Sequence, residues 1–142
     1  MEVNRKEVLM KMTDSHYDGE NTECSEITSV AFYEGTDNDY TITYKESGDF
    51  EGCEASLKVV GKKAVTLTRA GGGYNVQLII EQGQRHNCIY NTPFGAIQLG
   101  VFAEKVFTDI REGEGELKLS YSIDFNTGFV SENDITVTIK NI

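Results

Sequence analysis

Arg69 is the residue of this sequence best placed to recognise a ligand. Val65 and Leu67 alternate with polar neighbours ahead of it, so all three share one face of a predicted strand and should point inward. A guanidinium keeps its charge and needs hydrogen-bond acceptors when it is buried. One interpretation is an anion clamp that binds the carboxylate or phosphate of a ligand. The other is a structural arginine at one end of the fold that binds backbone carbonyls or an acid.

Two tyrosines and a histidine are further candidates for contacts with a ligand. Tyr90 and Tyr121 are expected on inward faces, where their hydroxyl groups orient a ligand or meet Arg69, or where the rings pack as core aromatics. His86 shares its strand face with Cys88 and Tyr90. One histidine and one cysteine are too few for zinc, and residues i and i+2 of a strand lie about 6.5 Å apart, too far for a nucleophile pair. The sequence therefore predicts no catalytic residue, no metal and no cofactor.

The composition excludes some partners and indicates a compartment. The formal net charge of −10 argues against non-specific binding of nucleic acid or an anionic membrane. Three widely spaced cysteines without a CxxC pattern, and a start that lacks a long apolar run, indicate a reduced, cytoplasmic protein. A length of 142 residues predicts a single domain over residues 1–142.

Charge is unevenly distributed along the chain. Twelve acidic residues and one basic residue lie between Asp14 and Glu54, whereas seven basic and three acidic residues lie between Ala55 and Arg111. This asymmetry either guides self-association into a homodimer or marks solvated outer faces.

The elements that position these residues are predicted to be short alternating strands. Leu117, Leu119, Tyr121, Ile123 and Phe125 give the clearest pattern, with a polar residue at every position between them. The remaining alternating segments are residues 7–13, 24–34, 40–45, 54–59, 64–68, 74–81, 84–92, 97–101 and 135–139. Residues 103–110 either continue the strand at 97–101 or begin another, and residues 15–23 are predicted to form a polar loop.

The segment Thr92-Pro93-Phe94-Gly95 contains the single proline and is expected to form a sharp corner between two strands. Proline cannot donate to a central ladder, and glycine accepts unusual backbone angles. Tyr90 and Phe94 are expected to pack beside this corner. Successive antiparallel strands with one polar face indicate a sandwich or a closed barrel. We favour an all-β, closed antiparallel barrel of 8–10 strands with mostly meander topology, because closure removes exposed strand edges.

Three segments resemble the bacterial YwiB-like family of domains of unknown function. They are V-T-L-T-R-A-G at residues 65–71, Y-N-T-P-F-G at 90–95 and L-K-L-S-Y-S-I at 117–123. The resemblance covers nearly the whole chain and departs mildly at Phe94, where the family often has tyrosine. It implies a calycin-like (lipocalin-like) β-barrel in a cytoplasmic, bacterial setting and implies no activity.

Two functional hypotheses remain at this stage. In the first, the protein is not an enzyme but binds a small amphipathic or anionic molecule inside the barrel, with Leu67, Leu78, Leu119 and Val137 as walls. In the second, aromatic side chains fill the barrel and the protein acts through its outer surface or by self-association.

Overall fold

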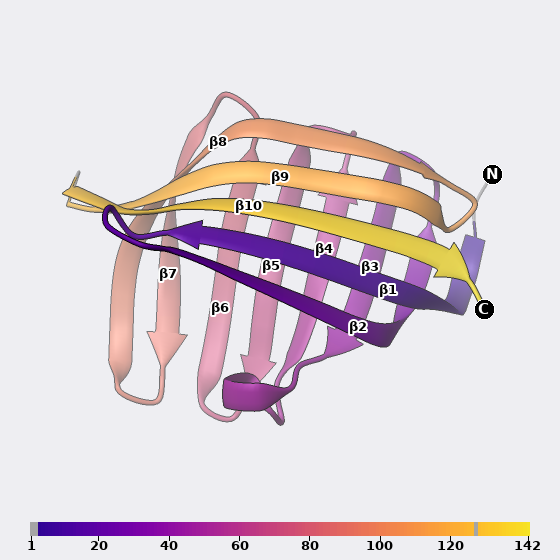
Figure 1. The fold of residues 1–142 in the computed structure, drawn as a ribbon, viewed down its shortest axis with the longest axis horizontal. Helices are drawn as coiled ribbons and strands as arrows, with labels where there is room; N and C mark the ends of the chain where they lie inside the picture. Colours follow the sequence, from indigo (N-terminus) through magenta and orange to yellow (C-terminus); the bar gives the residue numbers. More distant parts are fainter. Residues whose placement is uncertain (1–2, 127) are drawn as a thin grey trace.

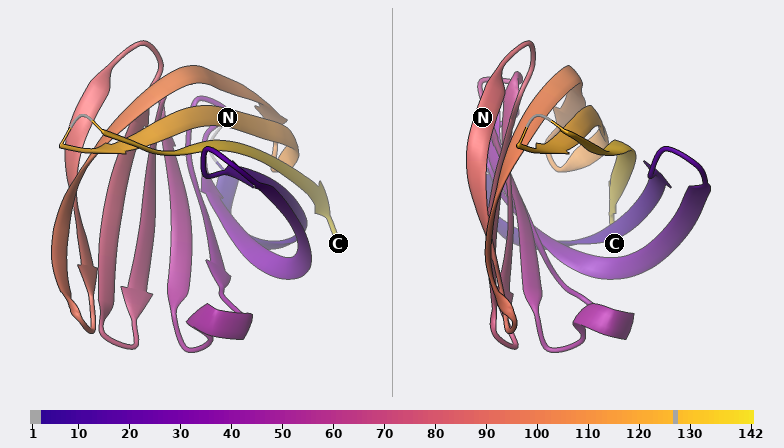
Figure 2. Two further views of the ribbon diagram at one scale, coloured as in Figure 1. Left: turned by 60° about the vertical axis from the view of Figure 1, so that its left-hand side comes forward. Right: turned by 90° about the vertical axis from the view of Figure 1, so that its left-hand side faces the viewer.

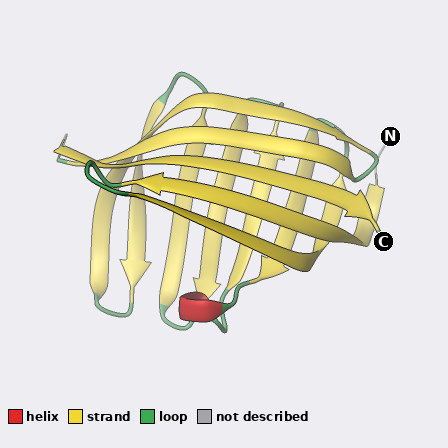
Figure 3. Cartoon of the chain, in the orientation of Figure 1, coloured by secondary structure: helices red, strands yellow, loops and turns green. Residues whose placement is uncertain are grey.

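The computed structural model describes residues 3–126 and 128–142, which form ten strands and one short 3-10 helix (Figure 3). The first five strands are β1 (Val3–Tyr17), β2 (Thr22–Gly35), β3 (Asp39–Lys45), β4 (Glu54–Val60) and β5 (Ala64–Gly71). The remaining strands are β6 (Tyr74–Glu81), β7 (Arg85–Thr92), β8 (Gly95–Arg111), β9 (Glu114–Phe125) and β10 (Gly128–Asn141). The helix η1 (Gly48–Phe50) lies between β3 and β4.

The strands close into a barrel. Each strand pairs antiparallel with its neighbours in the chain, and β1 pairs with β10 to complete the circle. The prediction of a closed antiparallel meander barrel of 8–10 strands is therefore confirmed, and the number is ten. Closure satisfies the backbone groups that an open sheet leaves at its edges. Among the described residues, no helix has the length and apolar character needed to cross a membrane.

The barrel is flattened into two crossing layers. The long strands β8, β9, β10, β1 and β2 run across the front of the upright strands β3–β7 (Figure 1). Seen from the side, the upright strands form one nearly flat layer and the long strands curve away from it (Figure 2). The interior lies between these layers.

One boundary differs from the sequence-based expectation, and the structure decides between the two alternatives left open for residues 103–110. Strand β1 continues to Tyr17, so the predicted polar loop at 15–23 is reduced to residues 18–21. Residues 103–110 continue β8 rather than begin a new strand, with a register shift between Ala103 and Lys105. Such a bulge bends a strand without ending it.

Half of the interior is filled by side chains. Its largest fully buried residues include Met10, Tyr33, Ile42, Leu57, Ile80, Leu117, Leu119 and Ile139. The rings of Tyr33 and Tyr40 pack with centroids 5.4 Å apart, and the Tyr40 hydroxyl lies 2.5 Å from Thr108 Oγ1. Each large apolar side chain buried here contributes about 1.5–3 kcal/mol to folding. Leu119 and Val137, predicted as cavity walls, belong to this packed half instead.

The barrel wall is thin at two seams. The ladder between β2 and β3 covers Phe32–Gly35, so the preceding residues of β2, 22–31, pair with β1 alone among the named strands. The ladder between β6 and β7 joins two residue pairs, Asn75 with Asn91 and Val76 with Tyr90. The first of these seams exposes the interior on the side of η1.

Candidate ligand-binding cavity

A cavity of about 620 Å³ occupies the other half of the barrel. Its apolar wall consists of Met12, Ile27, Ala55, Leu67, Val76, Leu78, Ile123 and Ile135. Four aromatic residues, Tyr44, Phe50, Tyr90 and Tyr121, also line it. Its polar groups belong to Asp14, His16, Ser25, Glu46, Ser47, Arg69 and Asn133. Pockets that hold small ligands have volumes of about 300–1,000 Å³ and similarly combine apolar walls with a few polar groups.

The cavity reaches the seam between β2 and η1. Ser25 and Ile27 come from the part of β2 that pairs only with β1 among the named strands, whereas Ser47 and Phe50 come from the connection between β3 and β4. Because residues from both sides of the seam line one space, the interior opens here. The alternation of β1 shows the same division of the barrel, since Met10 lies in the packed half and Met12 begins the cavity wall.

Arg69 points into the cavity as expected, and Glu46 holds it there. Arg69 Nε lies 2.5 Å from Glu46 Oε2, and Nη2 lies 3.0 Å from Oε1, so two parallel hydrogen bonds join the side chains. Both are largely buried, with 19% and 10% of their side chains exposed. The guanidinium carbon also lies 3.6 Å from the centre of the Phe50 ring. Of the two interpretations of Arg69, the geometry matches the arginine that binds an acid.

The Arg69–Glu46 pair is fixed by both backbone and charge. The Glu46 N–H donates to the Cys53 carbonyl at 2.9 Å, which anchors the residue just beyond the end of β3. Burial acts to lower the pKa of Arg69, but the hydrogen bond and charge of Glu46 outweigh it and raise that pKa. Arg69 therefore keeps its charge, and its ion pair with Glu46 neutralises the cationic charge inside the cavity.

The predicted tyrosines lie around the same space. In the sheet, Arg69 pairs with Val76, which in turn pairs with Tyr90, and this register leaves the Tyr90 hydroxyl 3.4 Å from Arg69 Nη1. Tyr121 is buried on β9, where burial raises the pKa of its hydroxyl well above the ordinary value. Burial also raises the pKa of Tyr44 to about 12, with Glu46 adding to the effect. The hydroxyl groups of Tyr44 and Tyr121 therefore remain protonated at neutral pH.

A second polar cluster, which the sequence analysis did not identify, lies across β1 and β10. His16 Nδ1 is 2.7 Å from Asn133 Oδ1, and the Asn133 amide donates to Ser131 Oγ at 3.0 Å. Asp14 lies two residues before His16 on the same face of β1. The predicted polar loop at 15–23 included His16, whereas β1 continues to Tyr17 and places Asp14 and His16 in the cavity lining.

His86 does not join the cavity. It shares the face of Cys88 and Tyr90, but its Nε2 lies 2.8 Å from Glu81 Oε1, and it is absent from the residues that line the cavity. Cys88 is buried and accepts the Ile79 N–H at 3.3 Å through its sulfur. Among the described residues, no group of three His, Cys, Asp or Glu side chains is arranged to bind a metal ion.

The predicted corner is the turn that joins β7 to β8. Thr92 pairs with Gly95, and Thr92 Oγ1 accepts the Phe94 N–H at 3.1 Å while donating to the Gly95 carbonyl at 3.0 Å. The expectation that Phe94 packs beside the corner is wrong, because 96% of this residue is exposed. With Pro93 and Phe94 as its two central residues, the turn directs Phe94 into solvent, and none of its four residues reaches the cavity.

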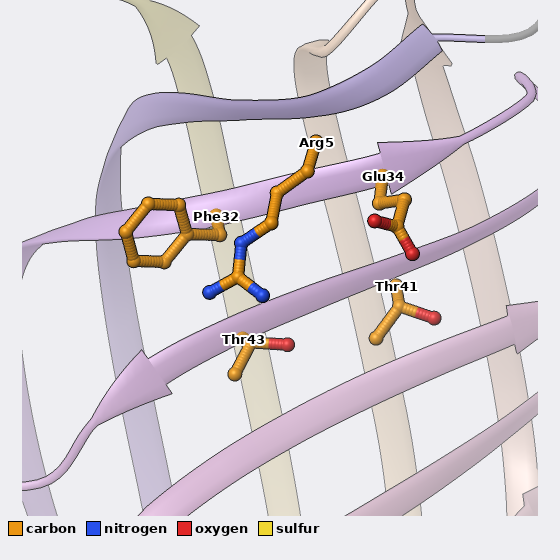
Figure 4. Close-up of a pocket in the computed structure, with 5 residues that line it drawn as sticks. All are labelled: Arg5, Phe32, Glu34, Thr41 and Thr43. Carbon is orange, nitrogen blue, oxygen red and sulfur yellow. The ribbon is translucent and has the colours of Figure 1, made fainter.

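A smaller surface depression lies on the outer faces of β1, β2 and β3 (Figure 4). The Arg5 guanidinium lies 4.2 Å from the centre of the Phe32 ring, with Glu34, Thr41 and Thr43 beside it. Its volume of about 90 Å³ is well below the range of ligand pockets. We interpret it as a cation–π contact on the surface.

Comparisons with known proteins identify a family and a fold. A family model described as a domain of unknown function, DUF1934, matches residues 10–137. The crystal structure of the ywiB protein from Bacillus subtilis superposes with a TM-score of 0.85, covering 99% of this chain and 95% of that chain at 18% identity. At this identity the structural match shows the fold alone. No curated protein matches the chain. The expected YwiB-like resemblance is confirmed.

Proposed function

Because this chain belongs to the DUF1934 family, which is described as a domain of unknown function, we propose a function on the basis of its cavity: the protein binds a small amphipathic molecule inside the barrel. The proposal assigns no catalysis to the protein and places it in the cytoplasm. The observation that carries it is the hollow half of the barrel, about 620 Å³ in volume, which adjoins a packed half that already supplies a core.

The distribution of polar groups supports an amphipathic occupant. The packed half is mainly a core of apolar and aromatic side chains. In the hollow half, apolar walls face Arg69, Glu46, Asp14 and His16. Inward polar groups oppose folding unless they are paired, and here they are concentrated where the space is. A molecule with an apolar body and a polar end fits this division.

A second candidate function, self-association, is favoured by exposed aromatic side chains at one end of the barrel. Phe125 and Phe129 flank the turn between β9 and β10 and are about half exposed, and the Phe129 ring packs 6.1 Å from that of Tyr17. Exposed apolar clusters are common in interfaces. Sedimentation equilibrium tests this candidate. A homodimer that uses this end should dissociate in Phe129→Ser and persist in Phe94→Ser, which alters the exposed tip of another hairpin.

Binding of N-phenyl-1-naphthylamine, whose fluorescence rises in apolar sites, tests the proposed function. We expect saturable binding to the wild-type protein and strong loss in Leu78→Trp, which places an indole in the cavity. Gln77→Trp, the adjacent residue on the outer face of β6, is the matched control and should bind normally. Ile27→Trp gives a second cavity-filling variant at the less constrained β2 edge. Equal binding by the Leu78, Ile27 and Gln77 variants would contradict the proposal. Independently of the dye, native mass spectrometry of gently purified protein would identify a co-purified ligand by its mass.

A further inference from the structure

We propose that the polar end of the occupant is a protonated amine that pairs with Asp14. This inference rests on the proposed function and specifies the chemical class of its ligand. It also changes the role expected for Arg69, which becomes part of the cavity wall rather than the group that recognises the ligand.

The charges around the cavity leave an unmatched carboxylate. Asp14, Glu46 and Arg69 are the lining residues with a fixed charge among those described, and −1 −1 +1 gives a formal charge of −1 with His16 neutral. Arg69 and Glu46 neutralise each other through two hydrogen bonds. The remaining negative charge belongs to Asp14, so a cationic group is the complement that the cavity lacks.

Asp14 also has an unsatisfied acceptor. Its Oδ1 is shielded from solvent and has no hydrogen-bond partner among the described residues. Buried polar atoms of folded proteins are almost always paired, and an unpaired one destabilises the fold. Burial raises the pKa of Asp14, as does the charge of Asp134, whereas His16 lowers it. An ammonium group would supply both the missing donor and the missing charge.

The surroundings of Asp14 suit an ammonium group. Cross-strand pairing places Ser25 of β2 and Ile135 of β10 on either side of Asp14, and both line the cavity. Tyr44 and Tyr121 line the same cavity as Asp14, whose charge contributes to the raised pKa values of their hydroxyl groups. Aromatic faces attract ammonium groups, and the attraction is strongest where water is excluded.

The hydrogen-bond partners of His16 indicate which ring nitrogen carries a proton in the neutral form. The Asn133 amide nitrogen donates to Ser131 Oγ, which turns Asn133 Oδ1 toward His16. His16 Nδ1 must then carry the proton that this oxygen accepts. In the neutral ring, Nε2 would therefore hold the lone pair and could accept a hydrogen bond from an ammonium group.

Three probes with the same eight-carbon chain test the proposal: octylamine, 1-octanol and octanoic acid, each used to displace N-phenyl-1-naphthylamine at pH 7. We expect octylammonium to displace the dye at concentrations at least tenfold lower than the other two. Asp14→Asn should abolish this preference. Asp134→Asn removes the same charge from the exposed face of β10, one position from the partner of Asp14, and should keep it.

The outcomes separate this inference from the function on which it rests. Equal displacement by all three probes would overturn the amine assignment and leave the binding function intact, as would a preference that survives in Asp14→Asn. A preference for octanoate that disappears in Arg69→Ala would also overturn it, in favour of the anion clamp. If the dye itself does not bind, the binding function fails and the inference fails with it.

Discussion

Arg69 and Glu46 face each other in the lining of the cavity, joined by contacts of 2.5 Å and 3.0 Å between nitrogen and oxygen. The two residues do not lie on neighbouring paired strands, since Glu46 lies just beyond β3 and Arg69 lies on β5. A bidentate pair of this kind fixes both position and orientation. It joins the β3–β4 connection to the barrel wall. It also neutralises the charges of Arg69 and Glu46 against each other.

Removal of either partner should destabilise the fold more than removal of both. Arg69→Met leaves a largely buried carboxylate and Glu46→Leu a largely buried guanidinium, each expected to cost about 2–4 kcal/mol of unfolding free energy. In the double variant, two apolar side chains replace the pair, so stability should return to within about 1 kcal/mol of wild type. Urea denaturation followed by circular dichroism measures all four corners of the cycle. Additive losses in the double variant would show that the two side chains are not coupled.

Glu46→Gln should change the ligand preference of the cavity. The amide keeps the shape of Glu46 but removes its charge, so Arg69 becomes available to an anion. We expect octanoate to gain at least tenfold in dye displacement relative to wild type, while 1-octanol is unchanged. Glu54→Gln, which removes an exposed carboxylate at the start of β4, is the control and should have no effect. An unchanged octanoate affinity in Glu46→Gln would mean that Arg69 stays inaccessible even without its partner.

The strands were predictable wherever their inward positions are apolar. In β9, Leu117, Leu119 and Tyr121 alternate with polar residues and all three are buried. The prediction failed at the end of β1, where Asp14 and His16 point inward. Polar side chains at inward positions remove the apolar alternation by which a strand is recognised. The polar residues of the cavity are thus the ones that conceal the end of β1.

The partners of the candidate residues were less accessible to sequence reasoning. Parity identified Arg69 as inward, but Glu46 is 23 residues away and lies outside any strand, so no local pattern connects them. His86 was grouped with Tyr90 because they share a face. The sparse pairing between β6 and β7 leaves His86 beside Glu81 instead. Such contacts depend on how hairpins meet in space, which period-two alternation does not encode.

Asp14→Asn should stabilise the ligand-free protein at neutral pH. Because the pKa of Asp14 is raised in the folded state, the folded protein holds its proton more tightly, and stability falls as pH rises from 3.8 through that pKa. We expect the variant to gain about 1 kcal/mol, or about 3 °C in Tm, allowing for the partial exposure of Asp14. The gain should vanish in acid, where wild-type Asp14 is protonated. A loss of Tm at pH 7 would show that the carboxylate has a favourable partner.

Buried tyrosines should make the protein sensitive to alkali. Burial raises the pKa values of Tyr33 and Tyr44 to about 12 from an ordinary value of 10.0. Unfolded chains lose these protons first, so stability should be complete below pH 10 and decline as pH approaches 12. Absorbance at about 295 nm reports tyrosinate formation. The native protein should titrate later than the same protein in urea, and Tyr44→Phe should remove part of the difference. Coincident titration curves would contradict the assignment.

The turn between β5 and β6 packs against the turn between β7 and β8. A Cβ at Gly73 would lie 2.9 Å from Pro93 Cγ, and the Gly73 φ of +88° is itself unfavourable for other residues. Since the β6–β7 ladder joins two residue pairs, this contact helps to hold the seam beside Tyr90. Gly73→Ala should therefore destabilise the protein by about 2–3 kcal/mol and weaken dye binding.

Gly83→Ala is a control that separates the two causes of the stability loss in Gly73→Ala, the strained backbone and the clash with Pro93. Gly83 has a similar φ of +77°, but a Cβ there would meet no atom within 4 Å, so a loss of about 1–2 kcal/mol is expected. Pro93→Ala removes the ring carbon that Gly73→Ala would strike. The double variant should accordingly lose less stability than the two single variants together. Equal losses at Gly73 and Gly83, with dye binding intact in both, would show that the two turns do not support each other across the seam.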